Sequence, residues 1–218
     1  TEAHTISKEQ VAELHLGEEN FDWIVFINGQ LHKELSKISI ENVEFLSFNF
    51  ALNDAKHKEV FDNYFNTIAA KDLAFTNLNE AFCKHGFFLK VPKNMVIEKP
   101  IHVFYISQNQ QDNTFYNTRN LLIAEEGSKV EIIESHHNFD DTFVFTNSVT
   151  EIFTYQNAKA DWHKLQNDSD TSYLMDHTFA KQERDSLTTV NTFSFGGKLV
   201  RNNLSFIHNG ENINSFMN

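Results

Sequence analysis

The hydrophobic pattern divides the chain into two regions with different periodicity. From about Ile101 onward, short runs rich in Val, Ile, Phe and Thr alternate with turns that contain Asn and Gly. Within 130–135, Val130 and Ile132 share one face while Glu131 and Ile133 share the other, because side chains alternate along a strand. This two-residue period is typical of β-strands. The second half of the chain shows almost no helical periodicity between these runs.

A series of candidate strands follows from this pattern. Their centres lie roughly 8–18 residues apart, the spacing of an all-β sandwich, barrel or solenoid. We expect strands at 101–107, 118–124, 128–135, 142–146, 149–156, 160–166, 172–180, 187–195, 199–207 and 213–217. Periodicity alone does not distinguish a sandwich from a solenoid, but a solenoid tolerates irregular loop lengths on one face, which suits this spacing.

The first part of the chain also contains extended segments. The run 21–27 is strand-like, and Asn28-Gly29 after it is a strong signal for a tight hairpin. A further extended run covers 43–50, and another covers 87–92.

Helical signals lie between these extended runs. Residues 7–10 form a capping box that predicts a helix through Leu16, ended by Gly17. A second helix, capped by Asn53 or Asp54, is predicted by the helical spacing of an apolar stripe, Val60, Phe61, Tyr64, Phe65 and Ile68. A third short helix would bury Leu78, Ala81 and Phe82 and end at Gly86. We therefore divide the chain into a mixed α/β region, 1–90, and a β core, 91–218.

Charge and composition exclude several classes of function. The 218 residues carry 18 basic and 30 acidic side chains, a net charge of −12, and show no basic run. Binding to nucleic acid or to an anionic membrane would require clustered Lys and Arg. No apolar run approaches the ~18 residues of a membrane span, and the first residues lack the pattern of a signal peptide. The single cysteine, Cys83, rules out a disulfide within the chain and suits a cytoplasmic protein.

Histidine is the most frequent candidate metal ligand, with eleven residues in the chain. His136, His137, His163 and His177 lie near carboxylates in the β region. Neighbours in a strand point to opposite faces, so His136 and His137 cannot both point inward. We therefore interpret these side chains as structural, and we assign no metal, cofactor-binding or catalytic residue in the chain.

Carboxylates and nucleophiles give no site either. The pairs Glu125-Glu126, Asp140-Asp141 and Glu183 with Asp185 fall in turn-like stretches, where solvated side chains are expected. Cys83 is interpreted as a packing residue of the third helix. The chain has no Walker-type loop and no Gly-x-Ser-x-Gly motif. We expect the chain not to be an enzyme.

Phenylalanine is abundant, with 22 residues. Eight of them follow the predicted strands, and we expect most to stack inside the β core: Phe139, Phe143, Phe145, Phe153, Phe179, Phe193, Phe195 and Phe206.

Taken in order, several segments resemble a known family. Residues 23–29 (WIVFING), followed by Leu35-Ser36, are similar to the first hairpin of SufD proteins. Segments 78–82 (LNEAF), 86–94 (GFFLKVPKN) and 98–101 (EKPI) are similar to the segment that leads into that family's core. Segments 126–134 (EGSKVEIIE), 201–204 (RNNL) and 209–212 (NGEN) resemble later repeats of the SufB/SufD family.

The resemblance implies a mainly β fold, a right-handed parallel β-helix with a small α/β N-terminal lobe. It implies a non-catalytic scaffold subunit of the cytoplasmic SUF system, with a SufB-like paralogue and a SufC-like ATPase as partners. It also implies that the chain corresponds to part of a SufD-type protein, without the family's leading helical segment and long C-terminal continuation. Ligands of the iron–sulfur cluster would then come from outside this chain.

Two alternatives remain open from the residues alone. One is a β-solenoid enzyme, secreted or cytosolic, that acts on acidic carbohydrate. The other is a metal-binding β-sandwich that uses His136, His163 or His177.

Overall fold

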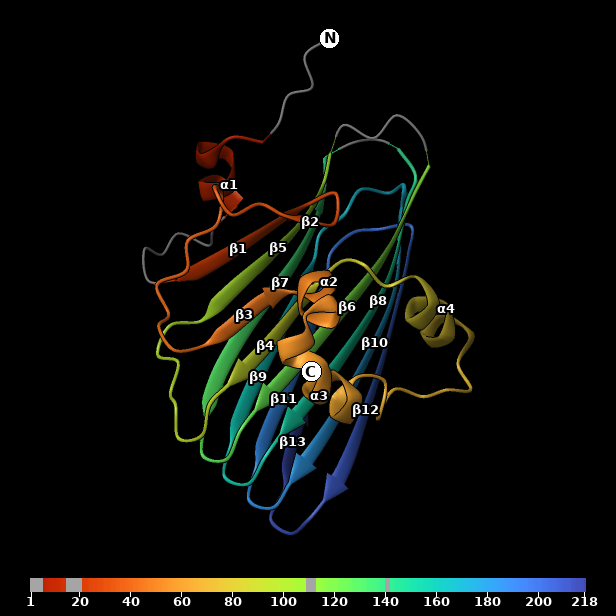
Figure 1. The fold of residues 1–218 in the computed structure, drawn as a ribbon. Coiled ribbons are helices and arrows are strands. Elements are labelled where there is room, and N and C mark those ends of the chain that lie inside the picture. The colour runs from red at the N-terminus through yellow and green to blue at the C-terminus, as the bar shows by residue number, and fades with distance from the viewer. Residues whose placement is uncertain (1–5, 15–20, 109–112, 140–141) are drawn as a thin grey trace.

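Two β-sheets that face each other dominate the computed structural model, which describes residues 6–14, 21–108, 113–139 and 142–218 (Figure 1). Sheet A has seven strands, in the order β13-β11-β9-β7-β5-β1-β2, and sheet B has six, in the order β12-β10-β8-β6-β4-β3. Sheet A comprises β1 (Asp22–Ile27), β2 (Gln30–Leu31), β5 (Ile101–Ser107), β7 (Lys129–Asn138), β9 (Lys159–Gln166), β11 (Leu187–Ser194) and β13 (Asn214–Met217). Sheet B comprises β3 (Glu44–Ser47), β4 (Phe87–Val91), β6 (Thr114–Ala124), β8 (Val144–Thr154), β10 (Ser172–Glu183) and β12 (Leu199–Asn209).

From β4 onward, successive strands alternate between the two sheets. Neighbours within each sheet are parallel, so the chain winds as a β-solenoid of about four turns. The expected parallel solenoid is therefore confirmed, and a sandwich of antiparallel strands is wrong. Antiparallel pairing among the named strands that the structure describes occurs at the start of the fold, between β1 and β2 and between β3 and β4.

The space between the sheets is filled by stacked apolar rows. Leu122, Ile152, Ala180 and Phe206 lie side by side on β6, β8, β10 and β12 in consecutive register. The first three are buried in the interior cluster, and Phe206 packs against it. The constant register places equivalent positions of successive turns in contact, which forms a continuous row through the core.

One corner of the solenoid repeats a tight turn with a left-handed residue. Asn94, Gly127, Asn157, Asp185 and Asn212 all have positive φ, between 56° and 70°. Asn and Asp tolerate this conformation better than other non-glycine residues, which explains their frequency at the turns. At Gly127 a Cβ atom would also lie 2.5 Å from the Asn94 Oδ1 atom of the neighbouring turn.

Helices cover the outer faces of both sheets. Helix α1 (Lys8–Leu14) lies over sheet A, where Val11 packs with Val25 and Phe104. The capping box is confirmed, because Ser7 Oγ accepts from the backbone of Gln10 and Gln10 Oε1 accepts from the backbone of Ser7.

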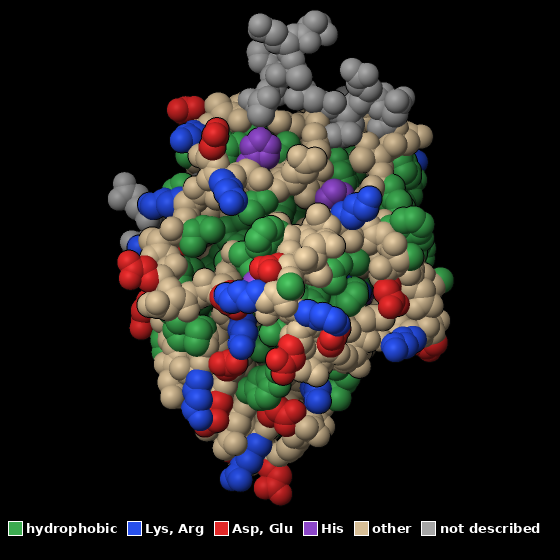
Figure 2. All heavy atoms as spheres, viewed as in Figure 1, with side chains coloured by type: hydrophobic (Ala, Val, Ile, Leu, Met, Phe, Trp, Pro, Cys, Tyr) green, Lys and Arg blue, Asp and Glu red, His purple; other side chains and the backbone are tan. Residues whose placement is uncertain are grey.

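A lobe covers the outer face of sheet B (Figure 1). Its elements are α2 (Phe48–Asn53), the 3₁₀ turn η1 (Ala55–His57), α3 (Lys58–Tyr64) and α4 (Ala74–Phe82). We call residues 48–82 the helical lobe. The predicted apolar stripe does pack against sheet B, with Phe61 buried against Phe88 and Leu121. On this face of the molecule acidic and basic side chains are intermixed (Figure 2).

Several strand predictions are wrong in their limits; β6, for example, begins at Thr114 and not at residue 118. The extended run 43–50 stops at Ser47, because Phe48 begins α2 and is buried in the lobe. The predicted strands 142–146 and 149–156 are one strand, β8, because Asn147 and Ser148 lie fully buried in mid-strand and not in a turn.

The expected inward stacking of Phe is also wrong for most of the eight residues. Phe153 and Phe179 pack on the outer face of sheet B beneath the helical lobe. The side chains of Phe139, Phe143, Phe193 and Phe195 are exposed. Within the described residues, no helix is long and apolar enough to cross a membrane.

Candidate functional site

A group of charged side chains lies inside the solenoid, between the two sheets. Glu134 and His136 come from β7, Lys164 from β9 and Asp176 from β10, and none is more than 7% exposed. Glu134 Oε1 lies 2.8 Å from His136 Nε2, and Trp162 Nε1 donates to Glu134 Oε2 over 2.9 Å. These positions follow from the two-residue period, which sends every second side chain of a strand inward.

Lys164 forms the second half of this group, which we call the interior charge network (Glu134, His136, Lys164 and Asp176). Its ammonium donates to both carboxylate oxygens of Asp176, over 2.8 and 2.6 Å, and to Thr178 Oγ1 over 2.7 Å. All three protons of the ammonium therefore have acceptors, as a buried charge requires.

The network favours the charged forms of Glu134 and His136. Burial alone would raise the pKa of Glu134, but Lys164 and His136 outweigh it and hold that pKa at about 2. Burial opposes a proton on His136, but Glu134 accepts its hydrogen bond and raises the pKa of the imidazole. A protonated His136 makes the four charges sum to zero, which lowers the cost of placing them between the sheets.

Neutral polar groups extend the network toward sheet B. The Tyr105 hydroxyl donates to Asn120 Oδ1 over 2.7 Å, and its ring stacks on His136 with centroids 5.1 Å apart. Burial raises the pKa of Tyr105 well above its ordinary value, so its hydroxyl remains a neutral donor.

A second buried ion pair lies outside the solenoid, between sheet B and the helical lobe. Arg119 on β6 and Glu151 on β8 are both fully buried and paired through Arg119 Nη2. Glu151 also accepts the backbone N–H groups of Asn66, over 2.9 Å, and Ile68, over 3.3 Å. The Arg119 guanidinium lies 4.9 Å from the centre of the Phe65 ring. This pair therefore joins the segment after α3 to the sheet.

Helix α4 contacts sheet B through the amide of Asn79, and not through a face made of Leu78, Ala81 and Phe82. Asn79 Nδ2 donates to the backbone carbonyls of Thr118 and Asn147, both over 2.9 Å. Asn79 is fully buried, whereas Phe82 is 61% exposed. The prediction that Leu78, Ala81 and Phe82 form the buried face is wrong, because the strand carbonyls facing this helix need donors.

The candidate histidines do not converge. His136 faces the interior, whereas His137 packs near Phe104 on the opposite face, as their neighbouring positions predict. His163 lies beside Asn191 and Glu131, and His177 lies 3.4 Å from Asn203. Among the described residues, no group of three or more His, Cys, Asp or Glu side chains is arranged to hold a metal ion.

The candidate carboxylates lie at corner turns. Glu125 pairs with Lys90 and Glu126 with Lys93, at 3.0 and 2.7 Å. Glu183 and Asp185 lie at the turn after β10, and Asp140-Asp141 lies outside the described residues.

Cys83 lies just after α4, with its Sγ 3.7 Å from the carbonyl of Glu80. Burial raises the pKa of its thiol, which disfavours the reactive thiolate. His85 turns away and lies 2.8 Å from the Gly29 carbonyl. Cys83 is half-buried in the apolar cluster of the lobe, which agrees with a packing role.

The buried charge pairs of four residues were not predicted from the sequence: Lys164, Asp176, Arg119 and Glu151. One available signal was the inward-facing row of β9, where Lys164 follows Ala160 and Trp162 at two-residue spacing. A charge in an otherwise apolar row requires a buried partner. Chemically, both charge groups are closed arrangements of paired ions, suited to fixing strand positions and not to binding a substrate.

Comparison with known proteins places this architecture. The SufBD core domain of SUF-system FeS cluster assembly matches residues 105–218, and the SufBD N-terminal region matches residues 8–103. A SufBD family iron–sulfur cluster assembly protein of Synechocystis is 25% identical over 90% of this chain and 45% of its own length. The chloroplast protein ABCI7 of Arabidopsis thaliana is 33% identical over 60% of this chain and 29% of its own length. A Staphylococcus saprophyticus SufBD family protein is 27% identical over 65% of this chain and 30% of its own length.

The chain thus spans less than half the length of these curated relatives. The core-domain match covers more than half of the chain and coincides with the solenoid strands from β6 onward. The chain belongs to the SufBD family of SUF-system iron–sulfur cluster assembly proteins.

Proposed function

We propose that this chain is the structural part of a SufD-type scaffold subunit, which pairs with a SufB-like paralogue and binds a SufC-like ATPase. The family match supports a role in cluster assembly. The single observation that carries the non-catalytic part is the pairing of the buried charges with one another. Glu134, Lys164, Asp176, Arg119 and Glu151 each have a charged partner inside the fold.

The iron–sulfur cluster is the cargo of this system, and its ligands would lie outside the chain. Iron–sulfur clusters are usually held by several cysteine thiolates, whereas this chain offers one thiol, which is half-buried and has a raised pKa. The same single cysteine suits the reducing cytoplasm, which is the location we propose.

Co-expression tests the partnership. The full-length protein that contains this chain is tagged and produced with a SufB-like paralogue and a SufC-like ATPase, and we expect the three to elute together at micromolar concentration. Absence of association with either partner would contradict the proposal.

Iron and sulfide analysis tests where the cluster is held. After anaerobic reconstitution and desalting, we expect the complex to retain iron and sulfide and the isolated chain to retain neither. A cluster held by the isolated chain in stoichiometric amount would mean that its ligands lie within these residues.

The carbohydrate-enzyme alternative requires an accessible Arg or carboxylate cluster on the solenoid. Arg119 with Glu151, on the outer face of sheet B, is fully buried beneath the helical lobe. A substrate has no access to it, so this alternative gains no support.

A further inference from the structure

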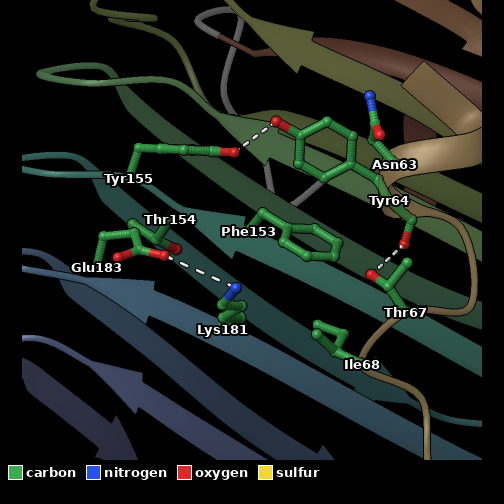
Figure 3. A pocket seen from close by; sticks show the side chains of 9 residues that line it. All are labelled: Asn63, Tyr64, Thr67, Ile68, Phe153, Thr154, Tyr155, Lys181 and Glu183. Atoms are coloured by element: carbon green, nitrogen blue, oxygen red, sulfur yellow. Dashed lines mark hydrogen bonds and ion pairs between the residues drawn. The ribbon is translucent and has the colours of Figure 1, made fainter. Parts of the chain in front are cut away.

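A cavity of about 370 Å³ opens where α3 and the segment after it meet the ends of β8 and β10 (Figure 3). It lies on the outer face of sheet B, and its lining includes no residue of the interior charge network. Its size falls in the range of ~300–1,000 Å³ that is typical of small-molecule sites. We call it the Tyr64–Tyr155 pocket.

The floor of the pocket is apolar. Phe153 is 6% exposed, and the Tyr64 ring meets it edge to face, with centroids 4.9 Å apart and an angle of 82°. Ile68 adds an aliphatic surface beside Phe153 (Figure 3). A ligand can therefore bury a hydrocarbon or aromatic body here.

Two phenol hydroxyls lie above this floor. Tyr64 Oη and Tyr155 Oη are 2.5 Å apart, so one hydroxyl donates to the other. The accepting hydroxyl keeps its own hydrogen, which can be donated to a ligand. Burial, followed by the contact with Tyr64, raises the pKa of Tyr155, so the Tyr155 hydroxyl stays protonated at neutral pH.

Lys181 supplies a positive charge with unused donors. Its side chain is 37% exposed, and its Nζ atom points into the pocket (Figure 3). Among the described residues, its ionic partner is Glu183 at 3.8 Å, beyond hydrogen-bonding distance. Glu183 is itself engaged by Asn209 Nδ2, which lies 2.8 and 2.7 Å from its two oxygens.

We propose that the Tyr64–Tyr155 pocket binds a small organic carboxylate. The carboxylate would accept from the Lys181 ammonium and from the free phenol hydrogen, and the apolar body would lie on Phe153 and Ile68. A single cation beside Glu183 favours a monoanion over a phosphate dianion. A cationic ligand would find Glu183 already engaged by Asn209, whereas the donors of Lys181 are free.

Titration of the purified protein with 3-phenylpropionate, followed by NMR or calorimetry, tests this proposal. The neutral 3-phenylpropanamide has the same shape and serves as the ligand control. We expect the acid to bind with a Kd in the millimolar range or tighter, and the amide at least about tenfold more weakly. No binding of the acid at about 10 mM, or equal binding of acid and amide, would overturn the proposal.

Two variants locate the binding. Lys181→Met is expected to weaken binding of the acid by about tenfold or more, and Tyr155→Phe by several-fold. Lys198→Met, which removes an exposed lysine elsewhere on the molecule, should leave affinity unchanged. Unchanged affinity for the acid in Lys181→Met would overturn the assignment. If that variant does not fold, the ratio of the affinities of the unaltered protein for the acid and the amide tests the proposal instead.

Discussion

The two buried charge groups of this molecule have different structural roles. Arg119 and Glu151 lie between sheet B and the helical lobe, and Glu151 also binds two backbone N–H groups of the lobe. The interior charge network lies between the sheets and joins side chains of β7, β9 and β10. The Arg119–Glu151 pair connects the helical lobe to sheet B. The interior charge network instead occupies inward-facing positions of the solenoid that would otherwise carry apolar side chains.

This difference predicts different failures. Loss of the outer pair should release the lobe locally and leave the solenoid turns intact. Loss of an interior charge should destabilise the stacked turns together, because the same strands carry the register of both sheets.

Glu151→Ala should have the largest effect. It leaves Arg119 buried without a counter-ion and removes the acceptor of two backbone N–H groups, at a cost of about 3–5 kcal/mol. Urea unfolding gives the free energy, and hydrogen exchange at the amides of Asn66 and Ile68 should accelerate more than exchange in β10.

Glu131→Ala is the matched control. This partly exposed carboxylate lies on sheet A, near His163, and not on sheet B with Glu151. Its effect should stay within about 0.5 kcal/mol. If Glu151→Ala costs under about 1 kcal/mol, the lobe is held by its apolar cluster and not by the ion pair.

Lys164→Met should rank second, at about 3 kcal/mol. It leaves Asp176 buried without its partner, and the loss is limited because an isolated buried carboxylate can take up a proton. Hydrogen exchange should accelerate across β7, β9 and β10 together.

The double variant Lys164→Met/Asp176→Leu separates charge from packing. Because it removes both ions, we expect at least half of the lost stability to return. A double variant as unstable as the sum of two single losses would mean that the network's value lies in its shape and not in charge pairing.

The interior network also predicts a pH window. The folded pKa of Glu134, about 2, lies below its ordinary value of 4.5, so its contribution is present above pH 4.5 and is lost as pH falls toward 2. The pKa of His136 is raised above 6.5, so its contribution is full below pH 6.5 and is lost as pH rises through the folded value.

The contribution of Glu134 and His136 to the free energy of unfolding should therefore be greatest between about pH 4.5 and 6.5. Below pH 4.5 this free energy should fall by on the order of 2 kcal/mol by pH 3. Unfolding measured from pH 3 to 9 checks the curve. His136→Asn should flatten the alkaline limb, whereas the exposed His208→Asn should not. An unchanged alkaline limb in His136→Asn would show that His136 is neutral in the fold.

The sequence allowed good prediction of strand positions but poor prediction of what the strands face. The limits of β5 were predicted to the residue, because its apolar run is bounded by Pro100 and by polar residues. Strand β8 was split because Asn147-Ser148 resembles a turn, yet Asn147 bonds to Asn117 at the same register of the neighbouring strand.

The charge pairs could not be predicted because they depend on that register. Lys164 and Asp176 are 12 residues apart and lie on different sheets, so their contact requires both the turn geometry and the inward face of each strand. The outward position of Phe153 likewise depends on the helical lobe that covers it, and alternation alone gives no sign of which face is covered.

The smallest predicted effect concerns α4, which contacts the outer face of sheet B through the neutral amide of Asn79 and not through an ion pair. Asn79→Leu leaves the carbonyls of Thr118 and Asn147 without their amide donor and should cost about 1–2 kcal/mol. Glu80→Leu, on the exposed side of the same helix, is the control and should cost less than about 0.5 kcal/mol. Equal losses in the two variants would mean that the amides of α4 add nothing specific. A loss confined to Asn79→Leu would show that the lobe is fastened at two points, one ionic and one through neutral amides.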